Sequence, residues 1–286
     1  MTNIKNNKKQ IMIGAGAALV VAGAVFGYYE WSHVSTDNAQ IQAHTLMLSS
    51  KVPGIVVEVL VQDNDPVKEG QVLARIDSQD YKNNVKQAEA DLDGVKAKLH
   101  DAEANYKRMA DLLRQNVVSR AQYDNAEATF REISKKVQAI QAQVSTAQLN
   151  ASYTEIKAPS DGRIARKSVE PGMVIPPGQP LFGFVADSSR WVIANFKETE
   201  ITNIEKGKYV KVEVDALPGQ EFHGEVDSLS PSTGAVFSLL PPDNATGNFT
   251  KVVQRVPVKI MLKDLTPKDI EKLQAGLSAN VSVKVR

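Results

Sequence analysis

The side chains that most often carry chemistry in proteins are few and scattered in this sequence. There is no cysteine, which excludes disulfides, thiolate metal sites and cysteine nucleophiles. The four histidines have no metal-ligand spacing, and they are His33, His44, His100 and His223. No nucleophile elbow, phosphate-binding loop or dinucleotide-binding fingerprint occurs. We therefore predict no catalytic residue, no metal site and no cofactor, and we expect that the chain is not an enzyme.

The composition is that of a folded protein without a nucleic-acid partner. The chain has 286 residues, of which 42% are hydrophobic and 23% charged, so it has room for roughly two or three small domains. The formal net charge is +1, and beyond the N-terminal lysines the basic residues stand near acidic ones. This balance gives no electrostatic basis for binding nucleic acid.

The chain is organised around two heptad-patterned segments within residues 80–151. Apolar residues recur in alternating steps of four and three from Tyr81 to Leu113, and the pattern restarts from Tyr123 to Ala151. Such a seam is typical of helices that coil around each other. The short break between the segments favours an antiparallel hairpin, with each helix roughly 50 Å long.

Local signals mark the ends of these two helices. Ser119 and Gln122 form a capping box for the second helix, and Asp77 or Ser78 can cap the first. Gly94 is a weak point, because a glycine inside a helix costs up to about 1 kcal/mol relative to alanine. The tip of the hairpin is therefore expected between the two helices, just before Ser119.

The hairpin interrupts a sequence repeat. A constant offset of 108 residues places Val56 on Ile164 and aligns the glycine-containing turns of the two halves. Each half has one apolar face and is too small to be stable alone. We therefore predict that residues 45–79 and 152–187 pair into one small β sandwich, into which the hairpin is inserted.

The N-terminal region predicts a membrane anchor. Residues 11–29 carry no charge and would span about 28 Å as a helix, which matches the hydrocarbon core of a bilayer. Lysines precede the segment and acidic residues follow it, so residues 1–10 are expected in the cytoplasm and the rest outside it. A cleaved signal peptide is the alternative, but the apolar run is too long and bulky residues follow it.

Within the predicted anchor, Gly23 and Gly27 form a small-residue step. Such a step lets another membrane helix approach closely. Small residues are also common in any spanning helix, so both interpretations stand.

The C-terminal third changes to longer strands with alternating apolar residues. This alternation predicts a compact β-barrel of about six strands over residues 188–286. Residues 30–44 are expected to add one strand, because the chain must pass the barrel on its way out from the membrane.

The split β repeat resembles the lipoyl or biotinyl carrier domain. In that domain, a modified lysine lies in the hairpin that joins the halves. Here the helical hairpin replaces that turn, and no Met-Lys or Asp-Lys pair remains at the junction. A role as a swinging-arm carrier is therefore set aside.

The full order of elements resembles the HlyD-type membrane fusion proteins, which are periplasmic adaptors of tripartite exporters. This order is anchor, half lipoyl domain, helical hairpin, half lipoyl domain and β-barrel, and it covers almost the entire chain. Several stretches are similar to the EmrA-like multidrug efflux subfamily, namely Thr36–Ala39, Trp191–Thr199, Phe237–Phe249 and Lys251–Lys259. The hairpin is shorter than expected for that subfamily.

The resemblance implies a function. Such an adaptor links an inner-membrane drug/proton antiporter of the major-facilitator type to a TolC-like channel in the outer membrane. It implies a homo-oligomer, a trimer or a hexamer, with the bulk of the chain in the periplasm. Two alternatives keep part of this interpretation: an adaptor of an ATP-driven type I protein or peptide secretion system, and an anchored coiled-coil scaffold without a transport role.

The resemblance also implies contact residues. Members that work with such channels carry Arg, Leu and Ser at the hairpin tip, and Arg108, Leu112 and Ser119 match that spacing. Each also has a plain structural explanation, as a solvated flank, a seam neighbour and a helix cap.

A second expected contact lies in the loop after residue 236. Phe237, Leu239 and Leu240 stand beside two prolines and are expected to contact the transporter or a neighbouring subunit. The alternative is a loop folded over the mouth of the barrel.

Overall fold

The computed structural model describes residues 32–234, 236 and 253–285. The predicted anchor with Gly23 and Gly27 lies outside these residues, as do Phe237, Leu239 and Leu240. Among the helices that the structure describes, none is long and apolar enough to cross a membrane.

The chain forms two compact units. The barrel unit comprises residues up to 44 together with residues from 187 onward, and the sandwich-hairpin unit comprises residues 45–186. Two long strands pass from one unit into the other, β1 (His33–Ser49) and β8 (Pro180–Lys197). The sequence pattern did not reveal this continuity, because each strand changes its core halfway along.

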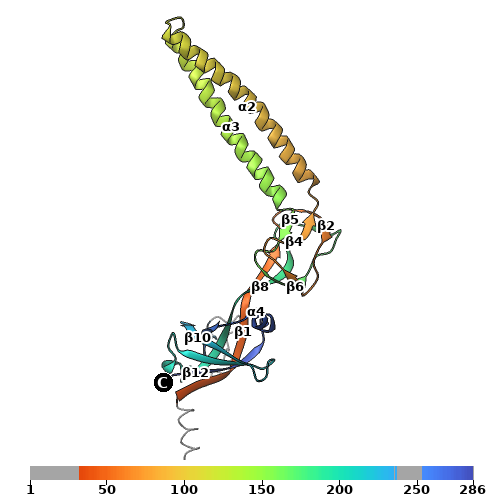
Figure 1. Cartoon of the computed structure of the whole chain (residues 1–286), viewed down its shortest axis with the longest axis vertical. Helices are drawn as coiled ribbons and strands as arrows, with labels where there is room; N and C mark the ends of the chain where they lie inside the picture. The colour runs from red at the N-terminus through yellow and green to blue at the C-terminus, as the bar shows by residue number, and fades with distance from the viewer. Residues whose placement is uncertain (1–31, 235, 237–252, 286) are drawn as a thin grey trace, which may run out of the picture. The chain divides into compact units, whose positions relative to one another are not determined.

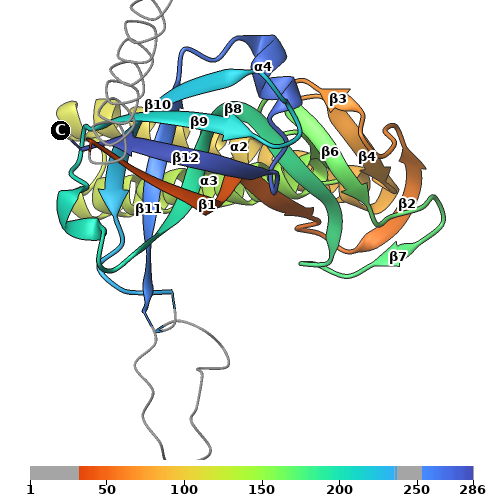
Figure 2. The ribbon, with the colours of Figure 1, turned by 90° about the horizontal axis from the view of Figure 1, so that it is seen from below.

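The barrel consists of six antiparallel strands. Their order is β1-β12-β9-β10-β11-β8, and a pairing of β1 with β8 closes the sheet. The remaining strands are β9 (Tyr209–Val214), β10 (Glu221–Leu229), β11 (Arg255–Lys263) and β12 (Ser278–Lys284). Figure 2 shows β9 lying between β10 and β12. The prediction of a barrel of about six strands is confirmed.

Alternation along the strands builds the barrel core. On β9, Val210, Val212 and Val214 are buried, and the intervening side chains face outward. The helix α4 (Pro267–Lys272) begins with a Thr266 capping box and is followed by the fully buried Leu273. Between β8 and β9 lies one short 3-10 turn, Ile201–Asn203.

The sandwich is built from the two halves of the repeat. Its strands are β2 (Gly54–Val59), β3 (Pro66–Val67), β4 (Val72–Ile76), β5 (Glu155–Lys157), β6 (Gly162–Lys167), β7 (Val174–Ile175) and the first residues of β8. The halves exchange strands, since β2 pairs with β7 and β6 pairs with β3. Neither half can therefore complete its sheet without the other.

The register repeats the sequence offset. Val56 pairs with Ile76 in the first half, and Ile164 pairs with Phe184 in the second half, each 108 residues further on. The side chains of all four residues lie in one shared core. Hence the prediction that the two halves form a single sandwich is confirmed.

The repeated glycines are explained by close packing. A Cβ atom on Gly162 would lie 2.4 Å from the carbonyl oxygen of Val185 and 2.5 Å from the ring of Phe184. A Cβ atom on Gly54 would lie 2.4 Å from the Ile76 side chain. Only glycine fits where the strands approach this closely.

The hairpin consists of α2 (Gln79–Arg114) and α3 (Arg120–Ser152), which run side by side in Figure 1. Every predicted seam position is buried or half-buried. Fully buried residues of the two helices are few, namely Leu92, Ala126 and Val144. The hairpin is thus held together by one narrow apolar seam.

The caps of the hairpin helices differ in detail from one another. Ser119 forms the predicted capping box with Gln122. At the start of α2, the Gln79 N–H donates to Asp77 Oδ1 at 2.9 Å, whereas the Ser78 side chain makes no capping bond. Asp77 is therefore the residue that caps this end.

Candidate partner-contact sites

The hairpin tip is a short turn held by backbone hydrogen bonds. The N–H of Val117 donates to the Leu112 carbonyl at 3.0 Å, and the N–H of Asn116 donates to the Leu113 carbonyl at 3.0 Å. Asn116 adopts a left-handed conformation with φ of 58°, which asparagine tolerates better than most residues. Val117 is 65% exposed at this end. The turn therefore presents an apolar side chain to solvent, which the heptad pattern did not predict because Val117 lies in the break between the helices.

The three residues predicted at the tip have different environments. Arg108 is exposed on α2, Leu112 is half-buried in the last turn of that helix, and Ser119 is exposed at the start of α3. The Ser119 N–H donates to Gln122 Oε1 at 2.9 Å, and the Gln122 N–H donates to Ser119 Oγ at 3.3 Å. Among the described residues, Arg108 forms no ion pair, so its guanidinium is available to a partner.

An aromatic cluster supports the tip from within the seam. The hydroxyl groups of Tyr106 and Tyr123 lie 3.0 Å apart, and the Tyr106 ring stacks on Phe130 at 5.4 Å between centroids. The hydrogen bond to Tyr106 raises the pKa of Tyr123. This cluster joins α2 to α3 and so fixes the end of the hairpin. The sequence pattern placed these residues in the seam but gave no sign of their contact.

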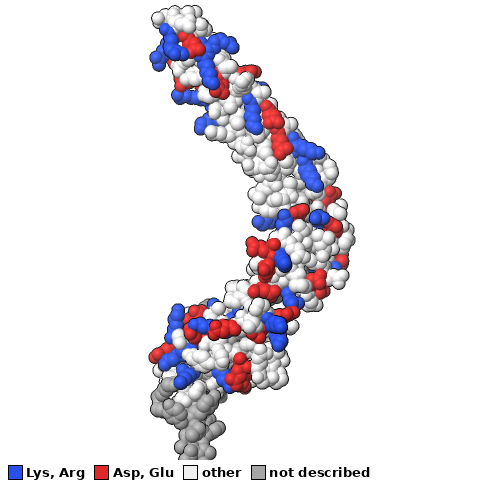
Figure 3. Space-filling view, viewed as in Figure 1, with Lys and Arg blue, Asp and Glu red and all other residues white. Residues whose placement is uncertain are grey.

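The visible face of the hairpin carries both signs of charge. Figure 3 shows lysine and arginine side chains interspersed with aspartate and glutamate along it. Several form pairs within one helix, such as Lys107 with Glu103 at 2.6 Å. These exposed pairs keep the helices soluble and contribute little to stability.

In the barrel, residues from three of the distinctive sequence stretches meet. Thr36 Oγ1 donates to the Asn195 carbonyl at 3.0 Å, and Asn195 Nδ2 donates to Asn38 Oδ1 at 3.0 Å. Arg255 Nη1 donates to the same Asn195 carbonyl at 3.1 Å. The cluster lies where the register of β1 shifts between Thr36 and Ala39. It therefore ties a bulged strand to β8 and β11, a contact that only the closed barrel creates.

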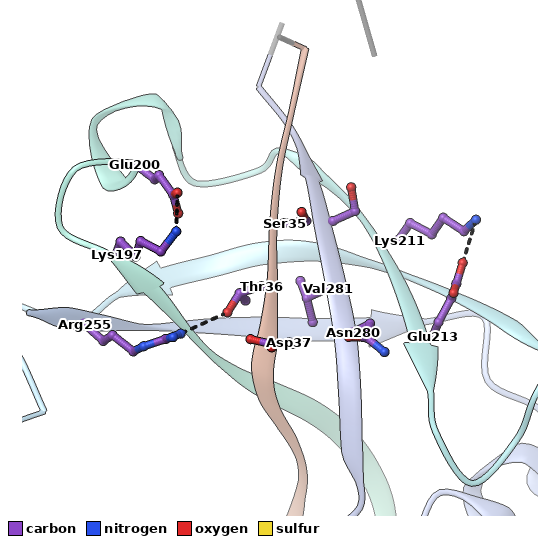
Figure 4. A pocket seen from close by; sticks show the side chains of 11 residues that line it. Ser35, Thr36, Asp37, Lys197, Glu200, Lys211, Glu213, Arg255, Asn280 and Val281 are labelled. Atoms are coloured by element: carbon purple, nitrogen blue, oxygen red, sulfur yellow. Dashed lines mark hydrogen bonds and ion pairs between the residues drawn. The ribbon is translucent and has the colours of Figure 1, made fainter. Parts of the chain in front are cut away.

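This cluster borders an open pocket of about 410 Å³ on the barrel. Figure 4 shows Asp37 and Arg255 at this pocket, with the ion pairs Lys197–Glu200 and Lys211–Glu213 also lining it. Lys211 contacts Glu213 and Glu221 at 2.8 and 2.6 Å, and these hydrogen bonds raise its pKa. Paired charges of this kind suit a polar contact surface rather than acid-base chemistry.

Other buried polar contacts in the barrel are structural. The Arg190 side chain is almost fully buried, and its Nε donates to the Leu273 carbonyl at 3.0 Å. It thereby satisfies a carbonyl at the end of α4. Burial lowers the pKa of Arg190. Within the described part of the chain, no group of His, Asp and Glu residues is arranged to hold a metal ion.

Comparisons with known proteins agree with this architecture. Residues 44–186 match the barrel-sandwich hybrid domain of RND MFP proteins, and residues 189–236 match the CusB-like β-barrel domain. The structure of the membrane fusion protein Spr0693 from Streptococcus pneumoniae superposes with a TM-score of 0.63 at 16% identity, covering 89% of this chain and 99% of that one. That similarity supports the fold.

Two relatives are similar over most of their length. The colistin resistance protein EmrA of Acinetobacter baumannii is 32% identical, over 100% of this chain and 97% of the relative. The multidrug export protein EmrA of Escherichia coli is 32% identical, over 87% of this chain and 75% of the relative. Membrane fusion proteins are structural linkers without enzymatic activity. With its split sandwich, inserted hairpin and barrel, the chain belongs to the membrane fusion protein family and is an EmrA-like adaptor.

Proposed function

We propose that this adaptor joins an inner-membrane drug/proton antiporter of the major-facilitator type to a TolC-like outer-membrane channel for multidrug export. Residues 11–29 anchor it in the inner membrane, and the rest of the chain lies in the periplasm. Several copies, three or six, surround a conduit, because a single copy encloses none. The names of the EmrA relatives, which concern multidrug export and colistin resistance, support the choice of cargo.

The observation that carries this proposal is the hairpin with its ordered tip. Two helices of 36 and 33 residues hold each other through one seam and end in a capped turn. A long element that buries so little except its own seam is suited to reach a partner rather than to complete a core. The Ser119 cap and the aromatic cluster then keep the end of the hairpin rigid for docking.

Arg108, Leu112 and Ser119 are the proposed contacts with the channel. A guanidinium on the flank of α2 suits a carboxylate or carbonyl of helical hairpins in the partner. Leu112 adds apolar area beside it, and Ser119 maintains the geometry of the turn. Because Arg108 packs against little, its replacement is expected to affect docking more than folding.

The test is Arg108→Asp in the full-length protein. We expect the free energy of unfolding to change by less than about 1 kcal/mol, as for most surface changes, and drug resistance to be abolished. The reversed charge recurs on every copy in the ring, so its effect on docking is multiplied. Lys98→Asp is the matched control, since Lys98 is also an exposed cation of α2 but lies further from the tip. Wild-type resistance at a normal protein level in the Arg108→Asp strain would refute docking through this residue.

The transporter side of the adaptor is proposed from sequence. Phe237, Leu239 and Leu240 form an apolar contact for the transporter or a neighbouring subunit, and Gly23 and Gly27 allow a transporter helix to pack on the anchor. Changing Leu239 and Leu240 to serine is expected to impair export while the melting temperature stays nearly constant. A large drop in stability would instead indicate that the loop covers the barrel.

A further inference from the structure

The two halves of the sandwich share one interior but have different exteriors. The repeat places Glu58 at the position of Arg166 and Arg75 at the position of Gly183, each 108 residues apart. Both pairs are cross-strand neighbours, Glu58 with Arg75 and Arg166 with Gly183. Because the two sheets pack against a common core, their outer surfaces point in opposite directions. We name the outer surface of β5-β4-β2-β7 the first face and that of β3, β6 and the start of β8 the second face.

The first face carries a closed set of ion pairs. Arg75 pairs with Glu58 across the strands and lies 3.7 Å from Glu155, and Lys157 lies 2.9 Å from the same Glu155. Lys157 and Arg75 lower the pKa of Glu155, Lys157 having the larger effect. Among the described residues, the carboxylate of Glu58 pairs with Arg75 alone. It therefore retains acceptor capacity for a second cation.

The first face also exposes apolar side chains beside these charges. Ile55 and Val174 are cross-strand neighbours, 50% and 73% exposed, and Val57 is 60% exposed. On the second face, the positions equivalent to Ile55 and Val174 hold Arg163 and Pro66. Three exposed β-branched residues in one strip are unusual for a surface that meets only water.

The second face lacks the counter-ion that the first face has. Arg166 is exposed, and within the described chain it forms no ion pair. Its cross-strand neighbour is Gly183, where a Cβ atom would lie 3.5 Å from the Arg166 side chain and 3.7 Å from Met47. Met47 is 64% exposed. The second face thus offers a cation, a hollow at a glycine and an exposed thioether.

We propose that the first face of one copy binds the second face of the next, with Arg166 pairing with Glu58 of the neighbouring copy. The apolar strip then packs on Met47 and the stems of the arginines, and the Arg75 ridge lies over the Gly183 hollow. Two different faces on opposite sides of one body form a head-to-tail contact, which closes into a ring when the rotation allows. This inference rests on the self-association in the proposed function and assigns its surfaces.

The experiment uses disulfide cross-linking, because the chain has no cysteine of its own. Full-length protein in detergent carries Glu58→Cys, Arg166→Cys or both. We expect a cross-linked dimer only when the two single variants are mixed, and a ladder of higher species with the double variant. Gln62→Cys mixed with Glu170→Cys is the matched control, since these exposed turn residues are also 108 positions apart but lie outside both faces.

A second measurement does not depend on cysteine. Arg166→Glu removes no ion pair within the described chain, so it leaves folding intact while opposing Glu58 of the neighbour. Sedimentation should show association weakened more than about tenfold, because like charges facing each other across an interface are costly. Lys68→Glu, an exposed change in a turn, should leave association unchanged.

The outcomes separate this contact from the wider proposal. Dimers from either single cysteine variant alone would mean that like faces meet, and would overturn the head-to-tail contact. Oligomers in sedimentation without any cross-link would also overturn it, while leaving self-association intact. A monomer at all concentrations would overturn both the contact and the ring. Drug resistance of the wild-type chain is measured separately and tests the export role independently of these results.

Discussion

The hairpin and the sandwich solve the problem of burial in opposite ways. The sandwich draws a dense core from both halves of a split repeat, with residues such as Ile164 and Leu73 completely buried. The hairpin has three fully buried residues in its two helices. Substitutions should therefore be costly and long-ranged in the sandwich, but small and local in the hairpin. This difference suits a rigid body that carries a surface-rich projection for partners.

The largest expected effect is that of Phe184→Ala in the sandwich. Phe184 is 1% exposed and lies beside Gly162, so truncation should cost about 3–5 kcal/mol. Because the halves exchange strands, hydrogen exchange should accelerate in β2 and β7 as well as in β6. Leu92→Ala in the hairpin is the comparison, and we expect about 2 kcal/mol there, because water reaches the narrow seam. Acceleration confined to β6 and β8 would contradict the exchange of strands.

A medium effect is expected for Gly162→Ala. The new methyl group would overlap the Val185 carbonyl and the Phe184 ring, and overpacking of this kind costs about 1–3 kcal/mol. Hydrogen exchange of the sandwich measures the loss. Unchanged protection of β6 would show that the strands can separate at little cost and that the sandwich is looser than its core suggests.

A smaller effect is expected for Ser119→Ala at the hairpin tip. Losing the cap should cost about 1 kcal/mol and speed hydrogen exchange in the first turn of α3 only. Ser119→Asn keeps a capping side chain and is expected to restore protection. If protection were lost along the whole hairpin instead, the seam would be less independent of its end than proposed here.

The smallest effect has the opposite sign. Gly94 lies within α2, and a Cβ atom added to it would have open space for 4 Å around it. Gly94→Ala should therefore stabilise the hairpin by up to about 1 kcal/mol. Slower hydrogen exchange around residue 94 would agree with this. Destabilisation would indicate that the seam needs the closer approach that glycine permits.

Several features could be predicted because they depend on local or repeated patterns. The heptad spacing from Tyr81 to Leu113 specifies which side of a helix is apolar, and these seam positions are indeed buried or half-buried. The capping box of Ser119 depends on residues within one turn. The contact roles of Arg108 and Leu112 depend on a partner, so they remain predictions.

What the sequence determined by itself is the hairpin seam, the paired halves and the alternation of the barrel strands, because each follows from periodicity along the chain. The offset between Val56 and Ile164 even specified the register of equivalent strand pairs. Tertiary structure alone decided the contacts between distant segments, such as the meeting of Thr36, Asn195 and Arg255. It also left Arg166 opposite a glycine, since cross-strand neighbours are set by folding rather than by spacing in the sequence.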